Sequence, residues 1–135
     1  MFDGEASRLT GRIPAYALYI DPPSGQVGTT DTEVQKNRRP ALVGKRAMEN
    51  LSRAVEKGET EGFMQILVNA ETKEILGASF LETRGDEAID CVRGAMYAEA
   101  PCTLRRRATP IHPTVAEFIP TMLDDLVTLP GGDAG

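Results

Sequence analysis

Tryptophan is absent from this chain, and aromatic residues and histidine are scarce. Its 135 residues contain three tyrosines, four phenylalanines and a single histidine, while 41% of the residues are hydrophobic and 26% are charged. At this length, that apolar content is enough for one hydrophobic core without metal or disulfide cross-links, and it excludes a disordered or fibrous chain. We therefore expect one folded domain.

Long apolar runs are also missing. No segment approaches the roughly 18 consecutive apolar residues that a membrane span needs. The first residues, Met1 to Glu5, lack the basic and apolar regions of a signal peptide. We therefore expect a soluble, cytoplasmic protein with no membrane partner.

Positively charged residues are fewer than negatively charged ones: the chain has 15 Lys and Arg and 20 Asp and Glu, which gives a net charge of -5. This sign disfavours general attraction to nucleic acids or anionic membranes. Residues 38–39 and 105–107 form two short arginine clusters, but adjacent residues of a helix point in different directions. We expect these clusters on solvated faces or interfaces, and we expect no nucleic-acid partner.

Two kinds of motif are missing as well. Cys91 and Cys102 have ten residues between them, which is neither the C-x-x-C spacing of redox sites nor a zinc spacing. We expect two free thiols and no metal site. The 13 glycines form neither G-x-G-x-x-G nor G-x-x-x-x-G-K-S/T, so the chain has no sequence signature of a nucleotide-binding loop.

Hydrophobic periodicity predicts an α+β domain. The strongest strands, residues 63–68 and 75–81, are joined by a short polar segment, which favours an antiparallel hairpin. Gly77 within the second strand predicts a close backbone approach. Strands followed by helices favour two layers, with helices packed on one face of an antiparallel sheet. Further strands are expected at 15–20 and 41–48, and helices at 30–37, 50–57, 86–99 and 114–126.

Both ends of the chain are poor in large apolar residues. Residues 1–13 resemble a linker from a region upstream, and the domain is predicted at 14–127. Residues 128–135 are predicted to be a flexible tail. Pro120 lies inside the last helical pattern and is expected to kink it.

The single histidine, His112, directly precedes the last predicted helix. Pro113 favours an extended backbone at His112, which turns the imidazole away from the helix. Thr114 and Glu117 have the spacing of a capping box, which folds the glutamate back toward His112. A carboxylate that orients an imidazole can support acid–base catalysis, so we predict His112 and Glu117 as catalytic and Pro113 and Thr114 as residues that shape the motif. The alternative is a plain capping box beside an incidental histidine.

The segment from His112 to Glu117 resembles the C-terminal signature of the FAD-dependent pyridine nucleotide-disulfide oxidoreductases, the family of glutathione reductase, dihydrolipoamide dehydrogenase and mercuric reductase. Residues 21–28 resemble the turn after the first strand of that family's dimerisation domain. Residues 62–78 resemble its central hairpin, and residues 85–87 resemble the start of its interface helix. The resemblance keeps the family's order and covers most of the chain.

This resemblance implies a C-terminal dimerisation domain of the flavoprotein disulfide reductase type, from a larger enzyme with FAD and NAD(P)H domains upstream. His112 would reach the redox dithiol and flavin of the partner subunit in a homodimer, and Glu117 would orient it. FAD and NAD(P)H would be held by the full-length enzyme and not by this chain, which alone would be inactive. Apolar surface on helix 86–99 and around Phe118 is expected at the interface.

Residues 13–23 and 119–123 resemble bacterial members described as mercuric-reductase-like. Mercuric reductases proper carry a C-terminal cysteine pair, whereas this chain ends in residues 131–135 without cysteine. The resemblance therefore does not extend to mercury reduction. An alternative function is a free-standing module that dimerises without catalytic activity.

Overall fold

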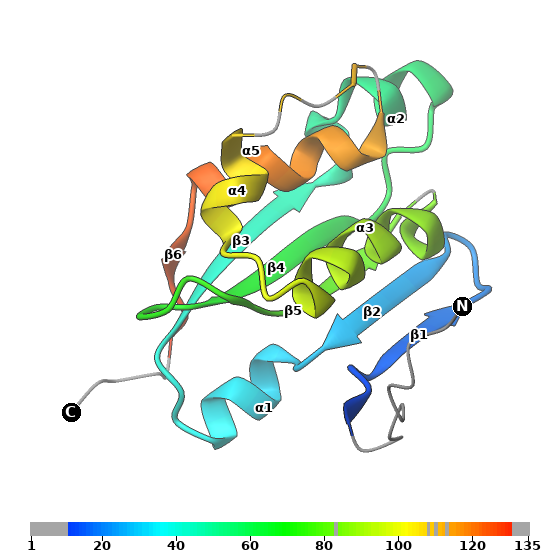
Figure 1. Ribbon diagram of the computed structural model, residues 1–135. Coiled ribbons are helices and arrows are strands. Elements are labelled where there is room, and N and C mark those ends of the chain that lie inside the picture. The colour runs from blue at the N-terminus through cyan, green and yellow to red at the C-terminus, as the bar shows by residue number, and fades with distance from the viewer. Residues whose placement is uncertain (1–10, 83, 108, 110, 113, 131–135) are drawn as a thin grey trace, which may run out of the picture.

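A six-stranded antiparallel sheet forms the centre of the domain (Figure 1). The computed structural model describes residues 11–82, 84–107, 109, 111–112 and 114–130. The strand order is β1-β2-β5-β4-β3-β6, and every neighbouring pair is antiparallel. The strands are β1 (Ala15–Leu18), β2 (Ser24–Gly28), β3 (Ala41–Ala47), β4 (Phe63–Asn69), β5 (Ile75–Leu81) and β6 (Val127–Thr128).

Most helices pack on one face of this sheet and enclose the main core. Apolar side chains of β4 and β5, such as Ile66 and Phe80, meet Ile89 of α3 and Met122 of α5 in one buried cluster. The helices are α1 (Asp31–Lys36), α2 (Ser52–Lys57), α3 (Gly85–Tyr97), α4 (Cys102–Arg107) and α5 (Phe118–Asp124), with short 3-10 helices η2 (Met48–Asn50) and η3 (Val115–Glu117). The α+β prediction is confirmed.

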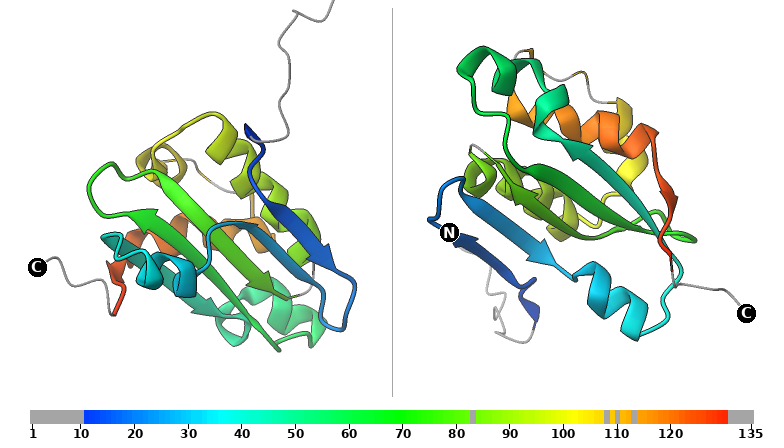
Figure 2. Two further views of the ribbon diagram at one scale, coloured as in Figure 1. Left: turned by 90° about the horizontal axis from the view of Figure 1, so that it is seen from below. Right: turned by 180° about the vertical axis from the view of Figure 1, so that it is seen from behind.

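Helix α1 is the exception to the one-face arrangement, because it lies on the side of the sheet away from α5 (Figure 2). Its only buried residue, Val34, packs in a second cluster with Leu67 and Leu76. Leu76 joins this side because the β4–β5 ladder passes from the pair Leu67 and Gly77 to the pair Val68 and Ile75, which leaves Leu76 as the extra residue of a bulge. One small helix therefore covers a corner of the second face.

The predicted hairpin of β4 and β5 is present, and Gly77 has the predicted close neighbour. A Cβ atom at Gly77 would lie 2.1 Å from the backbone oxygen of Thr29. Strand β2, in contrast, lies within residues 21–28, which in the sequence resemble a turn. Its Gly25 lets α3 approach, since a Cβ there would lie 2.4 Å from the backbone oxygen of Gly85. The sequence of β2 therefore reflects backbone contact with α3 more than strand preference.

Two predictions near the C-terminus need correction. The single kinked helix at 114–126 is instead η3 followed by α5, and Pro120 lies in the first turn of α5, where its missing N–H costs no helical hydrogen bond. The predicted tail begins too early, because β6 pairs with β3 and Leu129 is buried in the second cluster. Residues 131–135 of that tail, and residues 1–10 of the predicted linker, lie outside the described residues.

No helix in the described part of the chain is both long enough and apolar enough to cross a membrane.

Candidate functional site

The single histidine and the glutamate five residues after it are in direct contact. Nδ1 of His112 lies 2.8 Å from Oε2 of Glu117. The structure therefore brings together the two residues that the sequence singles out as an acid–base pair.

Glu117 is held by the start of the helical segment. It is the last residue of η3, and its Oε2 accepts a hydrogen bond from the backbone N–H of Thr114 at 3.5 Å, which is the glutamate half of the predicted capping box. The hydroxyl of Thr114 donates to the backbone oxygen of Ile111 at 2.7 Å, which ties together the loop that carries His112. Pro113, predicted to shape this loop, lies outside the described residues.

The two side chains differ in exposure. The His112 side chain is 67% exposed and that of Glu117 only 13%. The next residues, Phe118 and Ile119, are buried in the main core and anchor the segment. A carboxylate on an anchored segment therefore orients an imidazole that is largely exposed to solvent.

Glu82 is a second unusual acid, and no motif distinguishes it in the sequence. It directly follows β5, its side chain is fully buried, and neither carboxyl oxygen has a hydrogen-bond partner among the described residues. Burial raises the pKa of Glu82 from the ordinary 4.5 to about 8, and the charge of Asp86 adds to this. Glu82 is therefore mostly neutral at pH 7. Its inward position follows from the alternation of β5, in which Ala78 and Phe80 face the core.

The cysteines behave as the spacing predicts, since Cys91 and Cys102 are both free. Burial raises the pKa of the Cys102 thiol, against the opposing effect of Arg106 and Lys73. A buried thiol that stays protonated is a poor nucleophile. Within the described ranges, no group of three or more His, Cys, Asp or Glu side chains is placed to hold a metal ion.

Exposed apolar surface lies on and just after β1, where the sequence does not predict it. Phe118, expected at an interface, is only 8% exposed because the apolar side of α5 faces the main core. On α3, Tyr97 is 48% exposed. The exposed residues around β1 are Tyr16, Leu18, Tyr19 and Ile20, with exposed fractions of 54%, 50%, 88% and 54%.

Comparison with known families identifies the domain. Residues 14–123 match the family described as the pyridine nucleotide-disulphide oxidoreductase dimerisation domain. The chain belongs to this family. Enzymes of the family use FAD and NAD(P)H, and the name of the domain describes its role in forming a dimer interface. The prediction of a dimerisation domain, made from the segments around residues 21–28, 62–78 and 112–117, is confirmed.

Several relatives resemble the domain at moderate identity. The probable pyridine nucleotide-disulfide oxidoreductase RclA of Escherichia coli is 29% identical over 93% of this chain and 28% of the relative. The mitochondrial dihydrolipoyl dehydrogenase of Dictyostelium discoideum is 32% identical over 81% of this chain and 22% of the relative. The solved structure of RclA, a HOCl-induced flavoprotein disulfide reductase, superposes with a TM-score of 0.83 at 26% identity, over 90% of this chain and 28% of RclA. The dimerisation domain thus spans about a quarter of the length of these relatives.

Proposed function

We propose that this dimerisation domain supplies His112 and Glu117 as an acid–base pair to the redox dithiol of the partner subunit in a homodimeric flavin-dependent disulfide oxidoreductase. The observation that carries the proposal is the 2.8 Å contact between His112 Nδ1 and Glu117 Oε2, combined with an imidazole that is otherwise open to solvent. With Nδ1–H donating to the carboxylate, Nε2 keeps a free lone pair that can accept a proton.

The proposed chemistry of this chain is a reversible proton transfer. Nε2 of His112 accepts the proton of a thiol on the partner subunit, which leaves a thiolate and an imidazolium. The carboxylate of Glu117 stabilises the imidazolium, and the thiolate is the form that attacks a disulfide. Nε2 then returns the proton to the sulfur that leaves the disulfide, so the pair ends in its starting state.

FAD and NAD(P)H belong, in this proposal, to other regions of a longer cytoplasmic enzyme. The residues of this chain do not fit a dinucleotide site of their own, because the sequence has neither of the two glycine-rich phosphate-binding motifs. Dimerisation and the acid–base pair are the contributions of this chain, which alone is inactive as an oxidoreductase.

Within the family we assign the chain to the mercuric-reductase-like members, on the resemblance of residues 13–23 and 119–123. Mercury reduction itself is not part of the proposal. The proposed electron acceptor is instead of the disulfide class.

Light scattering combined with an absorbance scan tests the assembly. We expect a colourless homodimer of about twice 14.6 kDa at micromolar concentration. A monomer would contradict the dimer, and a yellow, flavin-containing peak would contradict the assignment of FAD to other regions. A colourless dimer that also fails the next test would support the non-catalytic module instead.

Complementation between subunits tests the role of the pair. The experiment uses a chimera in which this chain replaces the matching 28% of Escherichia coli RclA. One subunit carries His112→Gln with the dithiol intact, and the other carries His112 without the dithiol. Acid–base assistance of this kind contributes about 10²–10⁴-fold, so the His112→Gln variant alone should lose that much disulfide reductase activity. The variant without the dithiol should be inactive on its own, because it lacks the thiols that exchange with the disulfide. Mixed dimers should regain activity if the pair acts across the interface, and they should stay inactive if His112 serves its own subunit.

A further inference from the structure

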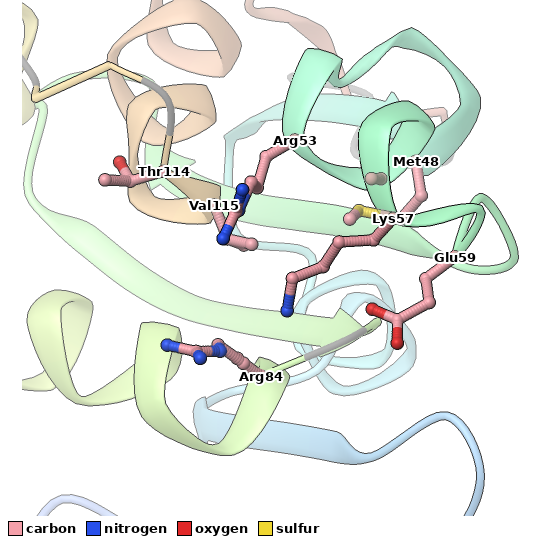
Figure 3. Close-up of a pocket in the computed structure, with 8 residues that line it drawn as sticks. Met48, Arg53, Lys57, Glu59, Arg84, Thr114 and Val115 are labelled. Carbon is pink, nitrogen blue, oxygen red and sulfur yellow. The ribbon is translucent and has the colours of Figure 1, made fainter.

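A small pocket lies between α2, the turn before α3, and η3 (Figure 3). It encloses about 140 Å³, and the buried side chains of Met48 and Ala54 form part of its lining. Since liquid water occupies about 30 Å³ per molecule, the volume corresponds to roughly four or five waters. That is enough for one phosphate or carboxylate group.

Three cationic side chains line this pocket from two sides. Arg53 and Lys57 come from successive turns of α2, and Arg84 comes from the turn before α3. In Figure 3 the side chains of Arg53 and Lys57 extend from α2 toward the space between these elements, and the side chain of Arg84 runs along the start of α3 on the opposite side of that space. Among the described residues that line the pocket, Glu59 is the only acid. The lining therefore carries three cations and one acid, in a chain whose net charge is -5.

These cations are only loosely neutralised within the chain. Nη1 of Arg53 lies 3.3 Å from Glu56, and Nη1 of Arg84 lies 3.7 Å from Glu87, both across one turn of exposed helix surface. Exposed pairs of this kind are weak, and each engages one nitrogen of a guanidinium that has five N–H donors. Between described residues, no ion pair engages Lys57. Several donors therefore remain available to a ligand.

The backbone of Arg84 adds a second observation. Its φ of 67° lies in the left-handed region, which is unfavourable for a residue with a Cβ atom and is adopted readily by glycine. Arg38, Lys73 and Glu99 also have positive φ values, so Arg84 is distinguished by combining this conformation with a place in the cationic pocket. Here the strained position carries one of the three cations, whereas glycine would relieve the strain and remove the charge.

We propose that this pocket binds a phosphate group, either inorganic phosphate or the terminal group of a phosphomonoester. A phosphate group has enough oxygens to accept hydrogen bonds from all three cationic side chains at once, whereas a carboxylate has only two. The guanidinium groups of Arg53 and Arg84 offer paired N–H donors that suit phosphate oxygens. The apolar lining from Met48 and Ala54 lowers the local dielectric constant, which strengthens the attraction.

The position of the pocket relates it to the candidate acid–base pair. Thr114 and Val115, which line the pocket, follow closely after His112 in the chain, at the start of η3. A bound phosphate would therefore lie beside the segment that fixes Glu117. The proposed site goes beyond the acid–base function and does not depend on it.

The test is a titration of the ¹⁵N-labelled 135-residue chain with inorganic phosphate at constant ionic strength, followed by the amide signals of Arg84 and Val115. We expect saturable shifts, and we expect the double variant Arg53→Gln/Lys57→Gln to bind at least tenfold more weakly. Lys36→Gln is the matched control, because Lys36 and Lys57 each occupy the last turn of a six-residue helix. This control should keep the wild-type affinity.

Arg84→Gly separates loss of binding from loss of folding. Glycine adopts a φ of 67° without strain, so this variant should be at least as heat-stable as the wild type while binding phosphate at least tenfold more weakly. Shifts that do not saturate, or equal affinity in the wild type and the double variant, would overturn the proposal. Acetate binding as tight as phosphate binding would overturn the choice of phosphate as the ligand. Competition by glycerol phosphate would support the phosphomonoester source, and its absence would support inorganic phosphate.

Discussion

The buried carboxyl of Glu82 makes the stability of this domain depend on pH. Glu82 is fully buried without a hydrogen-bond partner among the described residues, and its pKa is raised to about 8, first by burial and then by Asp86. In the unfolded chain the same group ionises near 4.5. Between these two values the folded state holds a proton that the unfolded state has released, so the free energy of unfolding falls as pH rises.

The size of the effect follows from the two pKa values. At about 1.36 kcal/mol per pH unit, the interval from 4.5 to about 8 corresponds to a loss of roughly 5 kcal/mol. The stabilising contribution is complete below about pH 4.5, declines through the neutral range, and is gone once the pH is well above 8. A whole domain is usually stable by about 5–15 kcal/mol, so this single group should dominate the alkaline limit of stability.

The variant Glu82→Gln replaces the acid with a neutral side chain of similar size. We expect the variant and the wild type to agree within about 1 kcal/mol near pH 5, while the variant becomes more stable by several kcal/mol near pH 9. Urea denaturation at intervals of one pH unit measures both curves, and their difference removes the contribution of every other titrating group. Glu61→Gln, at an exposed position, is the matched control and should follow the wild type.

Two outcomes would refute this reasoning. A difference between Glu82→Gln and the wild type that stays constant from about pH 5 to about pH 9 would mean that the carboxyl is not held neutral by burial. A wild type that gains stability relative to the variant as pH rises would mean that Glu82 is an ionised, paired carboxylate. Asp86→Asn separates the effect of burial on the pKa of Glu82 from the effect of the Asp86 charge. Most of the pH dependence of stability should remain in this variant, because burial is the larger cause.

Four further substitutions test the fold. Gly77→Ala should destabilise the domain by about 2 kcal/mol or more, because the added Cβ would lie 2.1 Å from the backbone oxygen of Thr29. Gly94→Ala should stabilise helix α3 by about 0.5–1 kcal/mol, because a Cβ at Gly94 would meet nothing within 4 Å. Urea denaturation measures both changes. Thr30→Ala removes the side chain that caps α1 at 3.2 Å and should cost about 1 kcal/mol in the same assay. Leu129→Ala should lower the free energy of unfolding by about 2–4 kcal/mol, since Leu129 is 6% exposed in the second cluster. No change in stability would support the original prediction that residues 128–135 form a flexible tail.

The parts of this domain that sequence reasoning finds are those fixed by local pattern. Alternation defines the β4–β5 hairpin, a 3.6-residue period defines α3, and a five-residue interval is enough to bring His112 to Glu117. Strand β2 cannot be found in this way, because glycine is required at position 25 by the close approach of the Gly85 backbone, 60 residues later in the chain. Helix α1 buries one side chain, Val34, against the second face of the sheet. One apolar residue in the sequence is not enough to predict which face of the sheet the helix covers.

Charged residues show the same difference between features set by local sequence pattern and features set by distant contacts. Alternation along β5 places position 82 on the inner face, yet the residue there is a glutamate, and acids are almost never fully buried unless paired. Pattern and residue type therefore make opposite predictions at Glu82, and the pattern prevails because β5 is held between β2 and β4 in the middle of the sheet. Two residues later, Arg84 takes a backbone conformation that favours glycine and brings its charge to the cations of α2, about 30 positions earlier. A buried acid and a strained cation within one turn are local conflicts that are expected where selection acts on something other than stability. The turn between β5 and α3 is therefore the first region to test for a function beyond the histidine motif.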